Sequence, residues 1–257
     1  MKSGMIFQFV SLLFISIAII WCIQRSRSGV VYTIRSIAGL DAIEEAVGRA
    51  TEMGRMIHYT PGLADLGGVA AAQTFAGLET LGLVARYVAR YGARLFVSIR
   101  QPIVLPLAEE VVKQAYMSEG NIDAFDDDCV QYLSSEQFAY AAAVMGIIQR
   151  EKAAANIMLG AFWAESLMIS EAGFHAGAIQ IAGSANISQV PFFVAACDYV
   201  LIGEELYAAG AIASGNPVKL GSIAGQDLGK LYIMVLVTVG VLAKTLGSSF
   251  ITDLIEK

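Results

Sequence analysis

The longest uncharged apolar runs of the chain lie near its two ends. Residues 5–23 (MIFQFVSLLFISIAIIWCI) contain no charged side chain, and a helix of this length spans about 28 Å, close to the hydrocarbon thickness of a bilayer. Residues 231–251 are also apolar, and Lys244 lies close enough to the end of this run for its ammonium group to reach lipid headgroups. The pattern predicts an N-terminal transmembrane anchor in residues 1–24 and a C-terminal transmembrane helix and tail in residues 230–257.

Each run has an alternative interpretation. The first could be a cleaved signal peptide, but only Lys2 precedes it, and Trp21 stands before Cys22, where a lipoprotein cleavage site has a small residue. The second could be a buried helix of the domain or a helix packed against another subunit. We favour two retained spans. The small or polar residues that could join the two helices are Ser11, Ser16, Thr238 and Gly240.

Basic residues set the expected orientation. Arg25, Arg27 and Arg35 follow the first run, whereas Lys2 precedes it. Cytoplasmic flanks of membrane helices are enriched in Lys and Arg. We therefore expect the central part of the chain in the cytoplasm and both termini on the other side of the membrane.

Between the apolar runs, short β-rich segments alternate with longer helical patterns. The expected strands are residues 56–60, 94–99, 156–160, 178–182 and 199–202, with 30–34 as a possible further strand. The expected helices are residues 40–53, 68–91, 105–117, 135–150, 164–172, 190–196 and 204–213. Residues 122–134 read as one long irregular insertion.

This alternation predicts a single Rossmann-like α/β domain over residues 25–229. Strands separated by helices of about ten or more residues cannot pair as hairpins, so they must be parallel, with crossover connections. Nearly continuous apolar runs are typical of strands buried on both faces. We expect one mostly parallel sheet with helices on both faces, flanked by the N- and C-terminal transmembrane helices.

The composition changes this picture by exclusion. Of the 257 residues, 56% are hydrophobic and 16% are charged, whereas soluble domains have about 45–50% and about 25%. The net charge of −6 argues against nucleic-acid binding, which needs a basic surface. The three cysteines form no close pair, so they predict neither a disulfide framework nor a zinc site.

The carboxyl ends of the expected strands hold the candidate site. Ligands of open parallel sheets bind outside these ends, and Gly or Ser turns followed by helix N-termini suit an anion. The candidate ligand-binding residues are His58, Thr60, Arg100, Glu165, Ser184, Asn186 and Glu204. Each has a structural alternative, because Ser, Thr and Asn cap helices, first-turn glutamates complement the helix dipole, and a lone strand histidine commonly packs in the core.

Familiar motifs for catalysis, cofactors or metals are missing from the sequence. There is no G-x-G-x-x-G and no G-x-S-x-G, and GQDLGKL near Gly225 lacks the spacing of a P-loop. The acidic stretch 119–128 (EGNIDAFDDD) lacks the turn glycine and distal glutamate of a calcium loop, so a solvated loop is expected. We therefore expect no cofactor and no metal. The sequence assigns no catalytic residue, and it favours a function other than catalysis.

Five runs of the sequence are distinctive together. They are residues 37–54 (IAGLDAIEEAVGRATEMG), 58–62 (HYTPG), 137–156 (QFAYAAAVMGIIQREKAAAN), 191–211 (PFFVAACDYVLIGEELYAAGA) and 221–231 (GSIAGQDLGKL). Across residues 37–231 the chain resembles an uncharacterised family of membrane-anchored prokaryotic proteins, classed as a domain of unknown function. The resemblance implies a protein of the inner or plasma membrane of a prokaryote, and it carries over no activity and no catalytic residue.

Three functions are compatible with these observations. We favour a membrane-anchored, homo-oligomeric scaffold or assembly component with a cytoplasmic α/β domain, whose partners are the lipid bilayer and other copies of the chain. One alternative is a small anionic-ligand-binding or enzymatic domain tethered to the membrane. Another is an accessory subunit of a larger membrane complex. No nucleic-acid partner is expected.

Overall fold

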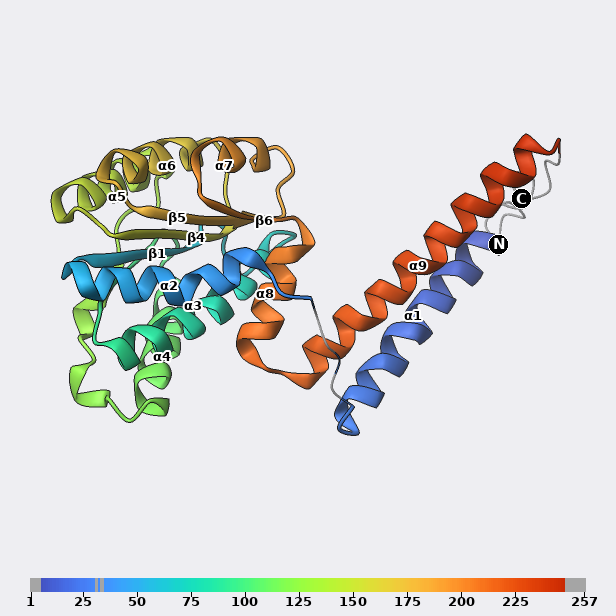
Figure 1. Cartoon of the computed structure of the whole chain (residues 1–257), viewed down its shortest axis with the longest axis horizontal. Coiled ribbons are helices and arrows are strands. Elements are labelled where there is room, and N and C mark those ends of the chain that lie inside the picture. Colours follow the sequence, from blue (N-terminus) through green and yellow to red (C-terminus); the bar gives the residue numbers. More distant parts are fainter. Residues whose placement is uncertain (1–5, 31, 33–34, 248–257) are drawn as a thin grey trace. The chain divides into compact units, whose positions relative to one another are not determined.

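The structure of the chain is a computed structural model that describes residues 6–30, 32 and 35–247. It consists of two compact units (Figure 1). One unit, Arg35–Ser214, contains the sheet and its helices and is named the α/β unit here. The other combines Met1–Ile34 with Gly215–Lys257 and contains two long helices, named the helical hairpin.

The α/β unit is built on six parallel strands in the order β3-β2-β1-β4-β5-β6. The strands are β1 (Met56–Gly62), β2 (Arg94–Ile99), β3 (Val130–Tyr132), β4 (Ala155–Ala161), β5 (Ile179–Ser184) and β6 (Tyr199–Ile202). The strand order changes direction between β1 and β4, which are neighbours in the centre of the sheet. All residues of β1 and β4 are buried, as expected for central strands of a parallel sheet.

Helices cover both faces of the sheet (Figure 1). On one face lie α2 (Ala38–Met53), α3 (Ala71–Tyr91), α4 (Leu105–Ser118) and α8 (Glu204–Ser214), and on the other lie α5 (Gln137–Glu151), α6 (Glu165–Ala176) and α7 (Val190–Ala196). Two apolar cores result. The larger includes Ile43, Leu81 and Ile157, and the smaller includes Met158 and Phe193.

The predicted fold class is confirmed, with one difference among the strands. Strand β3 lies inside the stretch 122–134 that was expected to be irregular, next to short 3₁₀ turns at Ile122–Ala124 and Asp127–Cys129. A strand of three residues is too short to produce a readable apolar pattern. The possible strand at 30–34 falls largely on residues 31, 33 and 34, which lie outside the described residues.

The helical hairpin pairs α1 (Ile6–Arg27) with α9 (Pro217–Thr245), side by side and antiparallel (Figure 1). Helix α9 begins well before the apolar run expected at 231–251. Both helices are long and apolar enough to cross a membrane.

Three glycines, four residues apart on α9, bring the two helices together. A Cβ at Gly221 would lie 2.9 Å from the carbonyl oxygen of Cys22, and one at Gly225 would lie 2.6 Å from the Cα of Ile19. Helix α1 therefore packs directly on the glycine surface, in the small-x-x-x-small manner common in membrane helix pairs.

Polar contacts add less to this pairing than the sequence suggested. The hydroxyls of Ser11 and Tyr232 share a hydrogen bond of 2.9 Å between the helices. In contrast, Ser16 and Thr238 each donate a hydrogen bond to a carbonyl one turn back in their own helix. The stripe of Gly221, Gly225 and Gly229 is the main contact surface.

Candidate functional site

A row of buried polar side chains crosses the sheet beneath α5 and α6. His58 of β1 lies directly opposite Asn156 of β4, which lies opposite Gln180 of β5. The ring of His58 makes hydrogen bonds of 2.7 Å through Nδ1 to Oδ1 of Asn156 and through Nε2 to Oγ of Ser98. The amide of Asn156 donates to Oε1 of Gln180 at 3.1 Å, and the amide of Gln180 donates to the carbonyl of Ala196 at 2.7 Å. His58 is thus fully enclosed within the sheet.

The hydroxyl of Tyr140, from α5, completes this row at its other end. It lies 2.7 Å from Oγ of Ser98 and 2.8 Å from Oγ1 of Thr60. Every group is satisfied when Thr60 donates to Tyr140, Tyr140 to Ser98 and Ser98 to the ring of His58. In that arrangement the neutral ring carries its proton on Nδ1 and donates it to Asn156.

The pKa values agree with a neutral row. Burial lowers the pKa of His58 to about 4, against a smaller opposing effect of the hydrogen bond with Asn156. Burial raises the pKa of the Tyr140 hydroxyl to about 12. Neither side chain carries a charge near neutral pH, and a buried network whose members are all hydrogen-bonded holds the elements that it joins in one arrangement.

Two of the charged candidates are engaged by neighbouring backbone at the carboxyl edge. The guanidinium of Arg100, just after β2, donates to the carbonyl of Ser135 at 2.9 Å and to that of Leu63 at 3.0 Å. The carboxylate of Glu165, fully buried in the first turn of α6, accepts the N–H of Trp163 at 2.7 Å and a hydrogen bond from Gln137. Arg100 and Glu165 each join two βα connections of this edge.

Ser184 and Asn186 act together in the connection after β5. Oγ of Ser184 accepts the N–H of Asn186 at 3.2 Å and donates to Oε1 of Gln73 at the start of α3. The side-chain amide of Asn186 donates to the carbonyl of Phe162 at 2.8 Å. Glu204 lies apart, exposed in the first turn of α8.

The structure therefore divides the seven candidates into three groups. His58 and Thr60 belong to one buried row, and Arg100 and Glu165 lie near enough to its Tyr140 hydroxyl to act on its pKa. Ser184 and Asn186 belong to one connection, and Glu204 lies apart. Five further residues of these networks were not predicted from the sequence: Tyr140, Ser98, Asn156, Gln180 and Gln73. A polar residue in the middle of an otherwise apolar strand was the signal for Ser98, Asn156 and Gln180.

Backbone contacts fill the place between β1 and β4 where the strand order changes direction. A Cβ at Gly62 (φ 91°) would lie 2.6 Å from the N atom of Ala161, and one at Gly160 (φ 156°) would lie 2.1 Å from the carbonyl oxygen of Pro61. The N–H of Leu63 donates to the carbonyl of Ala161 at 2.8 Å. Open sheets usually bind ligands at this place, and here main chain occupies it. Binding of a small anion at this edge stays a prediction.

Exposed apolar side chains follow the carboxyl edge from one end of the sheet to the other. In the order of the strands they are Phe138 after β3, Ile103 after β2, Val69 after β1, Trp163 after β4, Ile187 after β5 and Ile202 at the end of β6. Val69 is fully exposed and Ile187 is 83% exposed. We name these six residues the apolar row. The opposite edge exposes Met53, Tyr91, Met117 and Phe174 in last helical turns, none as open as Ile187.

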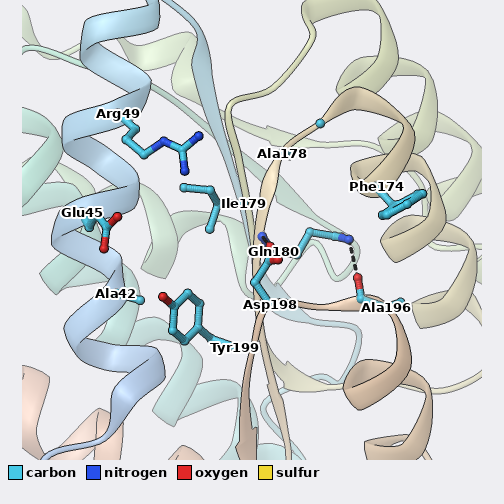
Figure 2. Close-up of a pocket in the computed structure, with 11 residues that line it drawn as sticks. Ala42, Glu45, Arg49, Phe174, Ala178, Ile179, Gln180, Ala196, Asp198 and Tyr199 are labelled. Atoms are coloured by element: carbon cyan, nitrogen blue, oxygen red, sulfur yellow. Dashed lines mark hydrogen bonds between the residues drawn. The ribbon is translucent and has the colours of Figure 1, made fainter.

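A hollow of about 610 Å³ lies at that opposite edge. Figure 2 shows Glu45 and Arg49 of α2 on one side of β5, and Phe174 and Ala196 on the other. Asp198 accepts the backbone N–H of Gln180 there at 2.8 Å. Because α6 and α7 end at this edge, their carbonyl ends add negative potential to that of the acids. The hollow is therefore poorly suited to an anion.

Among the described residues, no group of three or more His, Cys, Asp or Glu side chains is arranged to hold a metal ion. A second hollow of about 560 Å³, lined in part by Arg94, Arg150 and Glu151, also lies at the amino ends of the strands. Arg94 and Arg150 both contact Glu151 there, and Asp126 and Asp128 add two further acids to the lining.

Fold and surface together define a class: a Rossmann-like α/β unit joined to two apolar helices that could cross a membrane. Comparison with known proteins gives the family. Residues 1–255 match the family described as "Domain of unknown function (DUF6754)", so the chain belongs to it. No curated protein and no solved structure matches the chain. The expected membership of an uncharacterised family is confirmed.

Proposed function

We propose that the protein is a membrane-anchored, homo-oligomeric scaffold whose α/β unit assembles with other copies in the cytoplasm. The apolar row carries this proposal. Exposed apolar groups gathered along one edge commonly mark a protein contact surface. The polar candidates of the same edge are bonded to neighbouring connections, which favours a rigid contact surface over a ligand site.

The helical hairpin supports membrane attachment. Its outer surface exposes large apolar side chains along both helices, among them Phe9, Leu12, Ile17, Met234 and Val241. Burying one such side chain fully is worth about 1.5–3 kcal/mol. A hairpin left in water would lack more than about 10 kcal/mol of this stabilisation. That is comparable to the free energy of unfolding of a typical domain, about 5–15 kcal/mol.

The depth of the hairpin in a bilayer follows from the register of its helices. Gly225 lies against Ile19, Gly229 against Ile15 and Tyr232 against Ser11. Each residue toward the C-terminus of α9 is therefore level with one residue closer to the N-terminus of α1. Lys230 is then level with Phe14, near the middle of the uncharged segment of α1. Asp227 is level with Ile17.

Two placements compete. Centring the bilayer on the apolar part of α9 would leave Ile17, Ile20 and Trp21 of α1 in water, at about 1.5–3 kcal/mol each. Centring it on α1 leaves Val241, Leu242 and Leu246 of α9 in water instead. It also buries Asp227 and Lys230, each costing about 2.5–3.5 kcal/mol when alone. Because these two form an ion pair at 2.9 Å, their joint cost is lower than the sum. We place α1 at the centre because its uncharged segment, residues 6–24, is about 28 Å long and matches the hydrocarbon thickness, whereas α9 has only thirteen uncharged residues between Lys230 and Lys244.

Membrane attachment is tested by extracting membranes that carry the full chain with alkaline carbonate. The proposed anchor predicts that the chain stays in the pellet and enters solution only with detergent. Release into the aqueous phase would refute the anchor, whatever the oligomeric state.

Assembly through the apolar row is tested by chemical cross-linking in intact membranes. The Val69→Asp, Ile187→Asp double variant should lose cross-linked species larger than a dimer, because charges at these tips oppose burial against another copy. The matched control is Phe174→Asp, which alters a residue 70% exposed at the opposite edge and should keep the native pattern. Equal patterns for the double variant and the native chain would overturn the role of the row.

A further inference from the structure

The face of α9 that points away from α1 carries an ion pair. Asp227 and Lys230 contact each other at 2.9 Å and keep 63% and 45% of their side-chain surfaces exposed. At about 100° per residue they lie about 140–160° around the helix from Gly225, the central residue of the contact with α1. In a single hairpin this pair faces outward.

Resting on the proposed membrane anchoring, the depth deduced above places this outward pair near the middle of the bilayer. Charged side chains at that depth almost always face the interior of a bundle and not the lipid. The lone hairpin has no interior on this side, because α1 occupies the opposite face of α9.

We infer that the Asp227–Lys230 face of α9 binds the same face of a second copy of this chain. Two copies inserted in the same direction and related by a two-fold axis along the membrane normal place identical residues at the same depth. Asp227 and Lys230 are separated by about 4.5 Å along the axis, a distance that the flexible lysine stem covers. The carboxylate of each copy therefore meets the ammonium group of the other.

A second copy fits this face better than lipid or an unrelated helix. The patch is complementary to itself, as a two-fold interface requires. It continues along the helix into Met234 and Val241, which are 60% and 61% exposed and supply apolar contact on the same side. An unrelated helix would need its own acid and base at the matching depth.

Disulfide trapping in native membranes tests the interface. A Met234→Cys chain, with its cysteine beside the two-fold axis, should form a disulfide-linked dimer on mild oxidation, and Val235→Cys, about 100° away on the helix, should not. Native Cys22 is buried against α9 and gives little background. Adding Asp227→Lys or Lys230→Asp should reduce the dimer at least tenfold, because two like charges then meet in lipid.

Co-expression supplies the decisive arm. Two differently tagged Met234→Cys chains, one with Asp227→Lys and one with Lys230→Asp, should form the mixed dimer again, because the two positive charges of one copy then face the two negative charges of the other. Ser16→Ala, which removes an exposed hydroxyl bonded within α1, should leave trapping unchanged. Trapping that survives either single charge change, or a mixed pair that fails to recover it, overturns the interface. Both results leave the anchor standing if all chains remain in the carbonate pellet.

Discussion

His58 is the residue whose chemistry the fold changes most. Its ring is fully buried between Ser98 and Asn156, and burial lowers its pKa to about 4. In the unfolded chain the pKa of a histidine is about 6.5. Between these two pH values His58 is therefore mostly neutral in the folded protein and mostly protonated in the unfolded chain.

This difference predicts an acid-dependent loss of stability. Above about pH 6.5 the ring is neutral in both states and costs nothing. As the pH falls from about 6.5 to about 4, the free energy of unfolding of the full chain in mild detergent should drop by about 3 kcal/mol. His58→Gln should flatten this part of the pH profile even though it also weakens the row. The matched variant is His175→Gln, which removes the exposed histidine of α6 and leaves the buried row intact. If the free energy of unfolding falls with pH by the same amount in the native chain and in His58→Gln, the assignment is contradicted.

At this scale the sequence predicted some roles and missed others. A polar residue such as Thr60 or Ser184 at a strand end was recognised, but which partner it meets depends on register and on the helix above. Tyr140 comes from α5, far along the chain from Thr60, and only the completed sheet brings their hydroxyls within 2.8 Å. Arg100 and Glu165 looked like ligand-binding groups because a sequence does not reveal that backbone carbonyls and N–H groups engage them first.

At the scale of elements, apolar periodicity predicted the long helices and the strands between them. It failed where length or context decided, as for β3 with three residues. Helix α9 is the second case, because Lys219, Asp227 and Lys230 interrupt its hydropathy while its helical hydrogen bonds continue from Pro217 to Thr245. The glycines that join α9 to α1 are four residues apart, a spacing that is visible in the sequence and that favours close helix packing.

The glycine contact predicts a sharp difference between two conservative substitutions. Gly225→Ala places a methyl group 2.6 Å from the Cα of Ile19, which is backbone and cannot move alone, so the helices must separate. Gly229→Ala meets only the side chain of Ile15 at 3.4 Å. Both changes gain the same helix propensity, so their difference reports packing. We expect Gly225→Ala to unfold at a lower dodecyl sulfate concentration than Gly229→Ala. The free energy of unfolding should be lower by about 1–3 kcal/mol. Equal stabilities would show that the helices do not pack through Gly225.

At the scale of the whole molecule, two self-contacts of different kinds are proposed for each copy, one in the α/β unit and one in the hairpin. A chain with two separate self-contacts builds assemblies larger than dimers, since neither contact consumes the other. This arrangement suits a scaffold. It also makes orientation decisive, because the apolar row meets other copies in the cytoplasm only if Arg25, Arg27 and Arg35 lie on that side.

Cysteine labelling of intact cells tests this orientation, and the native thiols interfere little. Burial raises the pKa of Cys129 to about 12 and that of Cys197 to about 11, so few thiolates are present to react. Phe174→Cys adds a thiol at a position that is 70% exposed in the α/β unit. The positive-inside rule predicts that a membrane-impermeant maleimide labels this variant only after the membrane is opened. A cysteine appended to the C-terminus should instead react in intact cells, because two spans return the chain to its starting side. Labelling of Phe174→Cys in intact cells would reverse the orientation and would place the apolar row outside the cytoplasm.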